Sequence, residues 1–270
     1  MIEHVPAINV ALLFISGLFC MLFPIAVLVV WKLKNRSASL LAALAGAVTF
    51  FVWALCLEQA LHMVMLPLVQ GSAVLYTVYG ALAAGVFEET GRFVTYKLFL
   101  RKTTAKGDPA DAVMYGIGHG GIEAVMLLSM NLLTFAGIAL LINAGQGETI
   151  LGAMMASVPE EQAALAQAQL EGYFLNQPIF YILASAERVL AITLHIMLSI
   201  TVFAAAHNKK YLWLFPASIL AHALFDTPVA LYQVKICPMW LMYTILVAFL
   251  IAMLPITVQL YKRMKNDLGK

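Results

Sequence analysis

Charged residues are scarce in this sequence, and their scarcity excludes several classes of protein. Only 11% of the 270 residues are charged, whereas 63% are hydrophobic and the mean hydropathy is +0.90. Soluble domains carry about 25% charged residues. The composition therefore excludes a soluble globular fold, a disordered chain and a nucleic-acid-binding protein, which needs high charge or a basic patch. Cysteine is also rare, and 3 cysteines are too few for a disulfide scaffold.

Long apolar runs dominate the rest of the chain. A helix needs about 20 apolar residues to cross the hydrocarbon core of a membrane, and the alternating pattern of outer-membrane strands is missing. We predict an all-α, polytopic membrane helix bundle that forms a single integral membrane domain over residues 1–270. Its seven predicted transmembrane helices lie at about 7–31, 39–66, 75–98, 111–143, 177–206, 211–232 and 238–262.

The positions of Lys and Arg predict the orientation of these helices. Basic residues in short loops lie mainly on the cytoplasmic side of a membrane. The first apolar segment has no preceding Lys or Arg and is too long for a cleaved signal peptide. We therefore expect the N-terminus outside and the C-terminus in the cytoplasm, in a plasma membrane of the bacterial type. Apart from Lys235, every loop or tail base then falls on the cytoplasmic side: Lys32, Lys34, Arg36, Lys97, Arg101, Lys102, Lys106, Lys209, Lys210, Lys262, Arg263, Lys265 and Lys270.

One long segment between predicted spans, at about 145–176, contains acidic residues but no Lys or Arg. Within it, Ser157-Val-Pro-Glu160 has the pattern of a capping box, which marks the start of a helix. We expect a short extracytoplasmic helix at about 157–171.

Acidic and basic side chains inside the predicted spans are the most informative feature. A charge at the centre of a bilayer costs about 2.5–3.5 kcal/mol, so such groups must face one another or a water-filled cavity. Several are three or four residues apart and therefore share a helix face. These groups are Glu88 and Glu89 with Arg92, His119 with Glu123, His222 with Asp226, and Glu58 with His62.

Residue counts from the predicted cytoplasmic ends bring polar groups of four helices to one depth. At about 1.5 Å per residue, they lie roughly 12–18 Å from the inner surface. We expect them to form one site that is reached from the cytoplasmic side, whereas Glu58 and His62 are expected near the outer end, apart from it. The groups at the common depth are Glu88, Glu89, His119, His195 and His222.

Structural interpretations stay open for some of these residues. The Glu88-Glu89-x-x-Arg92 run could be an ion pair that fixes one helix to its neighbours, and His119 could be a buried imidazole paired with Glu123. Glu187 and Arg188 are best explained as a buried structural pair. The glycines in the segment 116–121 follow no strand, so they indicate close helix packing rather than a phosphate-binding loop.

Glutamates and histidines gathered in one place fit the attack of water on a carbonyl group. A Glu can take the proton of the water, while His residues hold a metal or stabilise the oxyanion. Zinc sites commonly combine two or three His with a carboxylate. We therefore predict a divalent metal site, most simply for zinc, with His195 and His222 as ligands. His119 or a carboxylate is the expected third ligand.

The same residues resemble motifs of a known group of enzymes. Glu88-Glu89-x-x-Arg92, His195 and His222-x-x-x-Asp226, in this order on successive helices, resemble the motifs of type II CAAX prenyl endopeptidases and their bacterial relatives. The segment 118–123, Gly-His-Gly-Gly-Ile-Glu, and the Glu-Glu-x-x-Arg spacing resemble more specifically the YhfC-type intramembrane metalloproteases. The resemblance covers a catalytic-like core at about 75–232.

This resemblance implies a membrane endopeptidase that hydrolyses a peptide bond of a membrane-embedded or lipidated substrate. It implies that Glu88 activates water together with His195, and that Glu89 pairs with Arg92. His222 and Asp226 would bind the metal or the oxyanion. The catalytic set is then Glu88, Glu89, His195 and His222, supported by Arg92, His119, Glu123 and Asp226.

Two other classes of protein could use the same buried groups. A proton-coupled transporter would use the Glu and His residues as a proton relay, although the duplicated halves common in carriers are not visible in this sequence. A non-catalytic membrane scaffold would keep them for packing. Metal analysis of the purified protein separates the endopeptidase from both alternatives.

Overall fold

A computed structural model describes residues 2–100, 108–156 and 158–268. All regular secondary structure in these residues is helical, which confirms the predicted all-α class. Some residues used in the sequence predictions lie outside the described residues: Arg101, Lys102, Lys106, Ser157 and Lys270.

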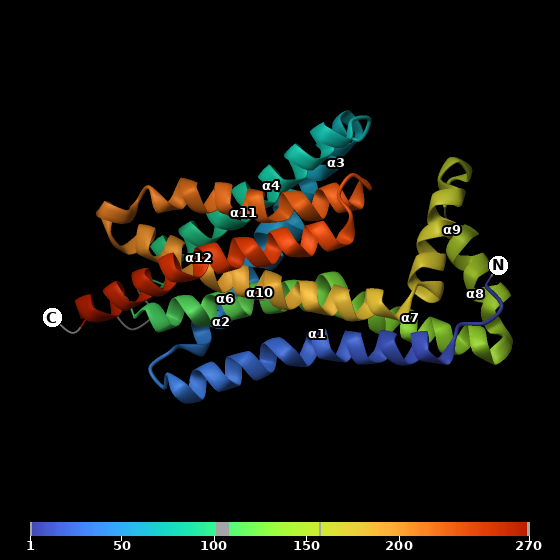
Figure 1. The fold of residues 1–270 in the computed structure, drawn as a ribbon, viewed down its shortest axis with the longest axis horizontal. Coiled ribbons are helices and arrows are strands. Elements are labelled where there is room, and N and C mark those ends of the chain that lie inside the picture. Colours follow the sequence, from blue (N-terminus) through green and yellow to red (C-terminus); the bar gives the residue numbers. More distant parts are fainter. Residues whose placement is uncertain (1, 101–107, 157, 269–270) are drawn as a thin grey trace. The chain divides into compact units, whose positions relative to one another are not determined.

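Figure 1 follows the helices along the chain. Four segments, η1 to η4, are π-helical, and η5 is a short 3₁₀ turn. The elements are α1 (Ala7–Lys34), α2 (Leu40–Phe50), η1 (Phe51–Glu58), α3 (Gln59–Val69), α4 (Ala73–Val94), η2 (Thr95–Leu100), α6 (Pro109–Ala124), η3 (Val125–Ser129), α7 (Met130–Leu141), η4 (Ile142–Gln146), α8 (Gly147–Ala156), α9 (Glu160–Leu175), α10 (Pro178–His207), η5 (Lys209–Tyr211), α11 (Leu214–Gln233) and α12 (Met239–Leu268).

Within the described residues, 6 helical runs are long and apolar enough to cross a membrane. The helix α4 is not one of them, because Glu88, Glu89 and Arg92 interrupt the apolar character of its second half. The 6 runs are Ala7–Lys34, Leu40–Val69, Pro109–Ala156, Pro178–His207, Lys209–Gln233 and Met239–Asp267.

The chain divides into two compact units. Unit 1 comprises Met1–Phe23 and Ala124–Arg188, and unit 2 comprises Pro24–Glu123 and Val189–Lys270. In unit 1, the buried Asn9 ties α1 to the end of α9, because its amide donates to the carbonyl oxygens of Phe174 at 2.8 Å and of Asn176 at 3.0 Å. The helix α9 overlaps the segment for which a short helix was predicted.

In unit 2, α4 runs antiparallel to the helices on either side of it. On one side, Phe93 stacks on Phe215 of α11 at 4.5 Å, and Gly85 approaches Ala223 further along α11. On the other side, the Thr95 and Thr49 hydroxyls lie 2.8 Å apart, Gly91 lies against Trp53, and the Tyr79 hydroxyl lies 2.7 Å from His62 Nδ1. This register fixes which side chains of α3, α4 and α11 lie at the same level.

Glycines allow α6 to pack closely between two helices of unit 2. A Cβ atom on Gly118 would lie 1.9 Å from the carbonyl oxygen of Ala43 in α2, and one on Gly116 would lie 2.5 Å from Ile196 Cα in α10. Neither position can take a larger residue without moving backbone. The interpretation of this glycine run as a packing motif is thus confirmed, and the packing presents His119 to the interior, where it is fully buried.

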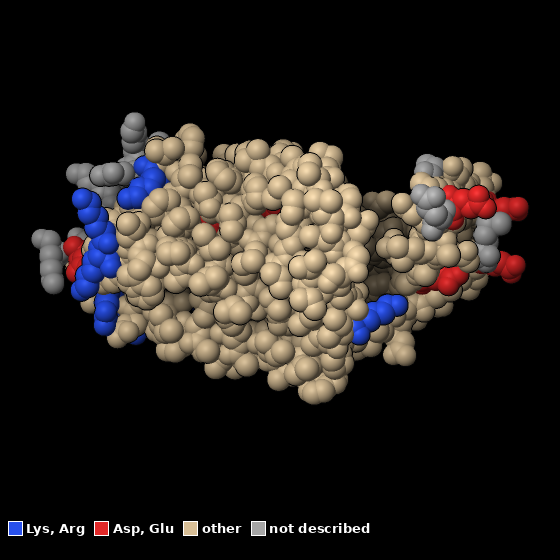
Figure 2. All heavy atoms as spheres, turned by 90° about the horizontal axis from the view of Figure 1, so that it is seen from above, with Lys and Arg blue, Asp and Glu red and all other residues tan. Residues whose placement is uncertain are grey.

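Basic side chains gather at one end of unit 2, which we call the Lys/Arg end. Figure 2 shows this cluster and a wide, almost uncharged surface next to it. The end is made by the last turns of α1 and α12, the segment after α4, and the turn between α10 and α11. Its described basic residues are Lys32, Lys34, Arg36, Lys97, Lys209, Lys210, Lys262, Arg263 and Lys265.

Candidate metal centre

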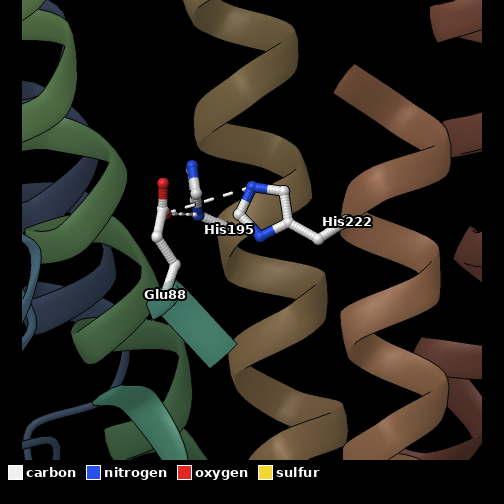
Figure 3. Close-up of side chains that lie close together, drawn as sticks. All are labelled: Glu88, His195 and His222. Atoms are coloured by element: carbon white, nitrogen blue, oxygen red, sulfur yellow. Dashed lines mark ion pairs between the residues drawn. The ribbon is translucent and has the colours of Figure 1, made fainter. Parts of the chain in front are cut away.

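Three side chains from three helices of unit 2 converge on one point. They are Glu88 of α4, His195 of α10 and His222 of α11, and all three are buried. Figure 3 shows the carboxylate and the two imidazoles facing one another. Glu88 Oε2 lies 3.9 Å from His195 Nδ1 and 4.0 Å from His222 Nε2. Each residue can offer one ligand atom, and these atoms lie within 4.8 Å of one another.

These separations suit a small divalent ion. Zinc binds His nitrogen at about 2.0–2.1 Å and carboxylate oxygen at about 2.0–2.2 Å. Atoms 3.9 and 4.0 Å apart can therefore ligate the same ion. Three protein ligands that leave one position open are the arrangement of catalytic rather than structural zinc sites.

Each histidine has a carboxylate on the nitrogen that points away from Glu88. His222 Nδ1 lies 2.8 Å from Glu89 Oε1, and His195 Nε2 lies 2.5 Å from Glu123 Oε2. A ring N–H that donates to a carboxylate fixes the imidazole orientation and makes the other nitrogen a better metal ligand. The ligand nitrogens are then His222 Nε2 and His195 Nδ1, which are the two that face Glu88.

Arg92 holds Glu89 and His195 in place. Its side chain is fully buried, and its guanidinium lies 3.4 Å from Glu89 Oε1, as the sequence predicted. It also donates to the His195 carbonyl oxygen at 3.2 Å and to His195 Nδ1 at 3.0 Å. An ion bound to His195 Nδ1 would have to replace this last hydrogen bond, so Arg92 and the metal compete for that nitrogen.

His119 contacts the centre through Glu88. Its Nε2 lies 2.8 Å from Glu88 Oε2, and within the described chain its buried Nδ1 has no hydrogen-bond partner. The i, i+4 spacing suggested a pair between His119 and Glu123, but Glu123 contacts His195 instead. In the group that could hold an ion, the third residue is therefore a carboxylate, Glu88, rather than His119.

Two carboxylates lie at the border of the centre. Asp226 Oδ2 is 3.4 Å from His222 Nε2, one helical turn further along α11. The predicted pair of Glu58 and His62 is present at 3.2 Å. Glu58, however, is not remote from the centre as expected, since it lies within electrostatic range of Glu88 and His222. The reason is the register of the two antiparallel helices, because the contacts of Gly91 with Trp53 and of Tyr79 with His62 place Glu58 at a level of α4 between Gly91 and Tyr79.

Glu187 and Arg188 form the ion pair that the sequence predicted, but both are partly exposed rather than buried. The Arg188 Nε–H donates to Glu187 Oε2 at 2.5 Å. Both residues belong to unit 1, whereas every residue of the candidate centre belongs to unit 2.

Comparison with known proteins identifies the family of this chain. Residues 19–247 match the family described as YhfC intramembrane metalloprotease. The chain is also 35% identical over 231 residues to the membrane protein YhfC of Bacillus subtilis (strain 168), a match that covers 83% of this chain and 85% of that protein. No solved structure matches the chain. The chain, an integral membrane protein whose buried Glu/His/His group could bind a metal, therefore belongs to the YhfC intramembrane metalloprotease family.

Proposed function

We propose that this protein is a metal-dependent endopeptidase that hydrolyses a peptide bond of a membrane-embedded or lipidated substrate. The observation that carries the proposal is the convergence of Glu88, His195 and His222 within a bundle of apolar helices. In addition, the second ring nitrogen of each histidine contacts a carboxylate. The family description agrees with the proposal. If these histidines served packing alone, His195 Nδ1 and His222 Nε2 would have no need to face the same Glu88 carboxylate.

The ion, which we propose to be zinc, would be held by Glu88 Oε2, His195 Nδ1 and His222 Nε2. When bound, it supplies an acidified water and polarises the substrate carbonyl. Oxygen and nitrogen ligands in this combination are usual for zinc.

The other residues have roles that follow from their contacts. Glu88 retains Oε1 to accept the proton of the attacking water, while the His119 hydrogen bond holds Oε2. Glu89 and Glu123 orient the two imidazoles. Arg92 pairs with the Glu89 carboxylate and compensates its negative charge. Asp226 lies 3.4 Å from His222 Nε2, close enough to supply a further oxygen ligand to the ion.

We also propose that α4 is a seventh transmembrane helix. Its 22 residues suffice to cross a bilayer, and its charged residues are buried against α10 and α11 rather than facing lipid. With seven crossings, the Lys/Arg end lies in the cytoplasm and the N-terminus outside. Membrane lipid and a membrane-embedded peptide are then the partners of the protein.

Cleavage can be tested before the substrate is identified. We expect membranes from cells that make the wild-type protein to contain new peptide termini, detected by mass spectrometry, within or next to membrane-spanning segments of other proteins. These termini should be missing with the His222→Ala variant at equal expression and should decrease with a chelator. Identical peptide termini in membranes with the wild-type protein and with the His222→Ala variant would contradict the proposed activity.

A further inference from the structure

Three polar side chains that the proposed reaction does not use form a chain beside the centre. Glu58, at the end of the π-helical segment η1, lies 3.2 Å from His62 Nε2, and His62 Nδ1 lies 2.7 Å from the Tyr79 hydroxyl. Glu58 is buried, although carboxylates are seldom buried without a functional or structural reason. π-Helical segments inside α-helices occur frequently at functional sites.

The helix register places this chain between the centre and the end of unit 2 opposite to the Lys/Arg end. The contacts of Gly91 with Trp53 and of Tyr79 with His62 bracket Glu58, so it faces the part of α4 that carries Glu88. His62 and Tyr79 lie further from the Lys/Arg end than Glu58. Asp226 lies on the same side, because it follows His222 by one turn in the direction of the end of α11.

The opposite side of the centre is closed by aromatic rings. Tyr96 follows Arg92 by one turn, Tyr115 precedes His119 by one turn, and Phe203 lies two turns beyond His195, each in the direction of the Lys/Arg end. The Tyr96 ring lies 4.7 Å from that of Tyr115 and 5.2 Å from that of Phe203. All three are buried in the apolar cluster that fills this end of unit 2. The hydroxyl groups on this side, among them those of Tyr96, Tyr115 and Ser199, are buried between these rings and apolar side chains.

The members of the polar chain that lie furthest from the centre are more exposed than the centre itself. The exposed fraction of the side chain is 0% for Glu89, 3% for His222, 8% for Glu88 and 7% for Glu58. It rises to 17% for His62 and 32% for Asp226. Among the described residues of unit 2, the more exposed polar side chains next to the centre therefore lie on the side of His62 and Asp226, whereas the hydroxyl groups of Tyr96, Tyr115 and Ser199 on the other side are buried.

We propose that Glu58, His62, Tyr79 and Asp226 form the entrance through which water and a hydrated divalent cation reach Glu88. The entrance opens at the end of unit 2 opposite to the Lys/Arg end, which replaces the access from the Lys/Arg end expected from the sequence. This inference rests on the proposed function, because the divalent cation is the one that the proposed metal centre binds. Two carboxylates along a path through apolar helices attract a cation and raise its rate of entry, and their oxygens can exchange with its hydration shell.

The rate of metal entry tests the role of Glu58. Apo protein in detergent is mixed with Co²⁺, and loading is followed by the visible absorption of the bound ion. Glu58→Gln should load about 10-fold more slowly than wild type, with the same final amount of Co²⁺ bound. Glu148→Gln, a matched change of an exposed glutamate in unit 1, should load at the wild-type rate. Equal rates for wild type and Glu58→Gln would contradict the entrance.

Cysteine labelling tests the path without using the metal. In a chain whose native Cys20, Cys56 and Cys237 are replaced, Glu58→Cys and Ser199→Cys each introduce one thiol at a buried position. Ser199 follows His195 by one turn toward the closed side. A charged methanethiosulfonate reagent reacts with thiolates in water, so Glu58→Cys should be modified and Ser199→Cys should not. His62→Cys gives the same test if Glu58→Cys does not fold.

The two experiments separate the possible failures. Modification of Ser199→Cys but not of Glu58→Cys or His62→Cys would place the water path at the Lys/Arg end and overturn the entrance. A wild-type protein that binds no Co²⁺, but whose Glu58→Cys thiol is modified, would contradict the proposed metal function while retaining the water path. Modification at neither position would contradict the path itself.

Discussion

Replacement of Glu88 by Gln is expected to abolish peptide hydrolysis while the protein still folds. Glutamine has the size of glutamate and can still accept the hydrogen bond from His119, so the packing of α4 is retained. It lacks the negative charge that holds a divalent ion and cannot accept a proton from water. Loss of a general base alone lowers rates about 10²–10⁴-fold, and loss of the metal ligand adds to this.

Two measurements check this prediction together. Cleavage is followed by the new peptide termini described above, and folding by thermal unfolding in detergent. Glu148→Gln serves as the matched control, because Glu148 is an exposed glutamate of unit 1. Full cleavage by the Glu88→Gln variant would exclude Glu88 from the reaction, whereas a large loss of thermal stability would assign it a structural role instead.

Replacement of Arg92 by Ala is expected to cause the largest loss of stability of any substitution in the centre. The Arg92 side chain is fully buried, and it contacts Glu89 and two atoms of His195. Its removal leaves the buried Glu89 carboxylate with its contact to His222 but without a permanent positive charge. Breaking a buried ion pair from one side typically costs about 3–5 kcal/mol.

A double-mutant cycle shows whether this loss comes from the ion pair. Chemical unfolding in detergent is compared for Arg92→Ala, Glu89→Gln and the double variant. We expect the double variant to be more stable than the sum of the single effects predicts, because the uncompensated carboxylate is gone. Strictly additive effects would show that Arg92 stabilises the protein through His195 and its packing on Tyr115 rather than through Glu89.

Much of the fold follows from the sequence because apolar length and charge position decide it. The apolar runs predicted the 6 helical runs that can cross a membrane, and counts along helices brought Glu88, His195 and His222 to one level. The end of the fourth predicted span at residue 143 differs from the structure, in which α8 continues the apolar run to Ala156. The bend between these parts is at Gly145, whose φ of 84° suits glycine.

The partners inside the centre could not be predicted from spacing. Spacing within one helix suggested that His119 pairs with Glu123, but each of them contacts a residue of another helix. Which face of a helix meets its neighbour depends on packing, and here the approaches of Gly118 to Ala43 and of Gly116 to Ile196 set the rotation of α6. A single sequence contains these glycines but not the helices that they contact.

The metal content of the purified protein tests the central claim most directly. The protein is purified without chelators or metal-affinity resin, and bound elements are measured by mass spectrometry. We predict about one divalent ion per chain, most simply zinc, and loss of this ion in the His222→Ala variant but not in Glu148→Gln. A wild-type protein that carries no ion and takes up none from added Zn²⁺ or Co²⁺ would contradict the assignment of Glu88, His195 and His222 as a metal centre.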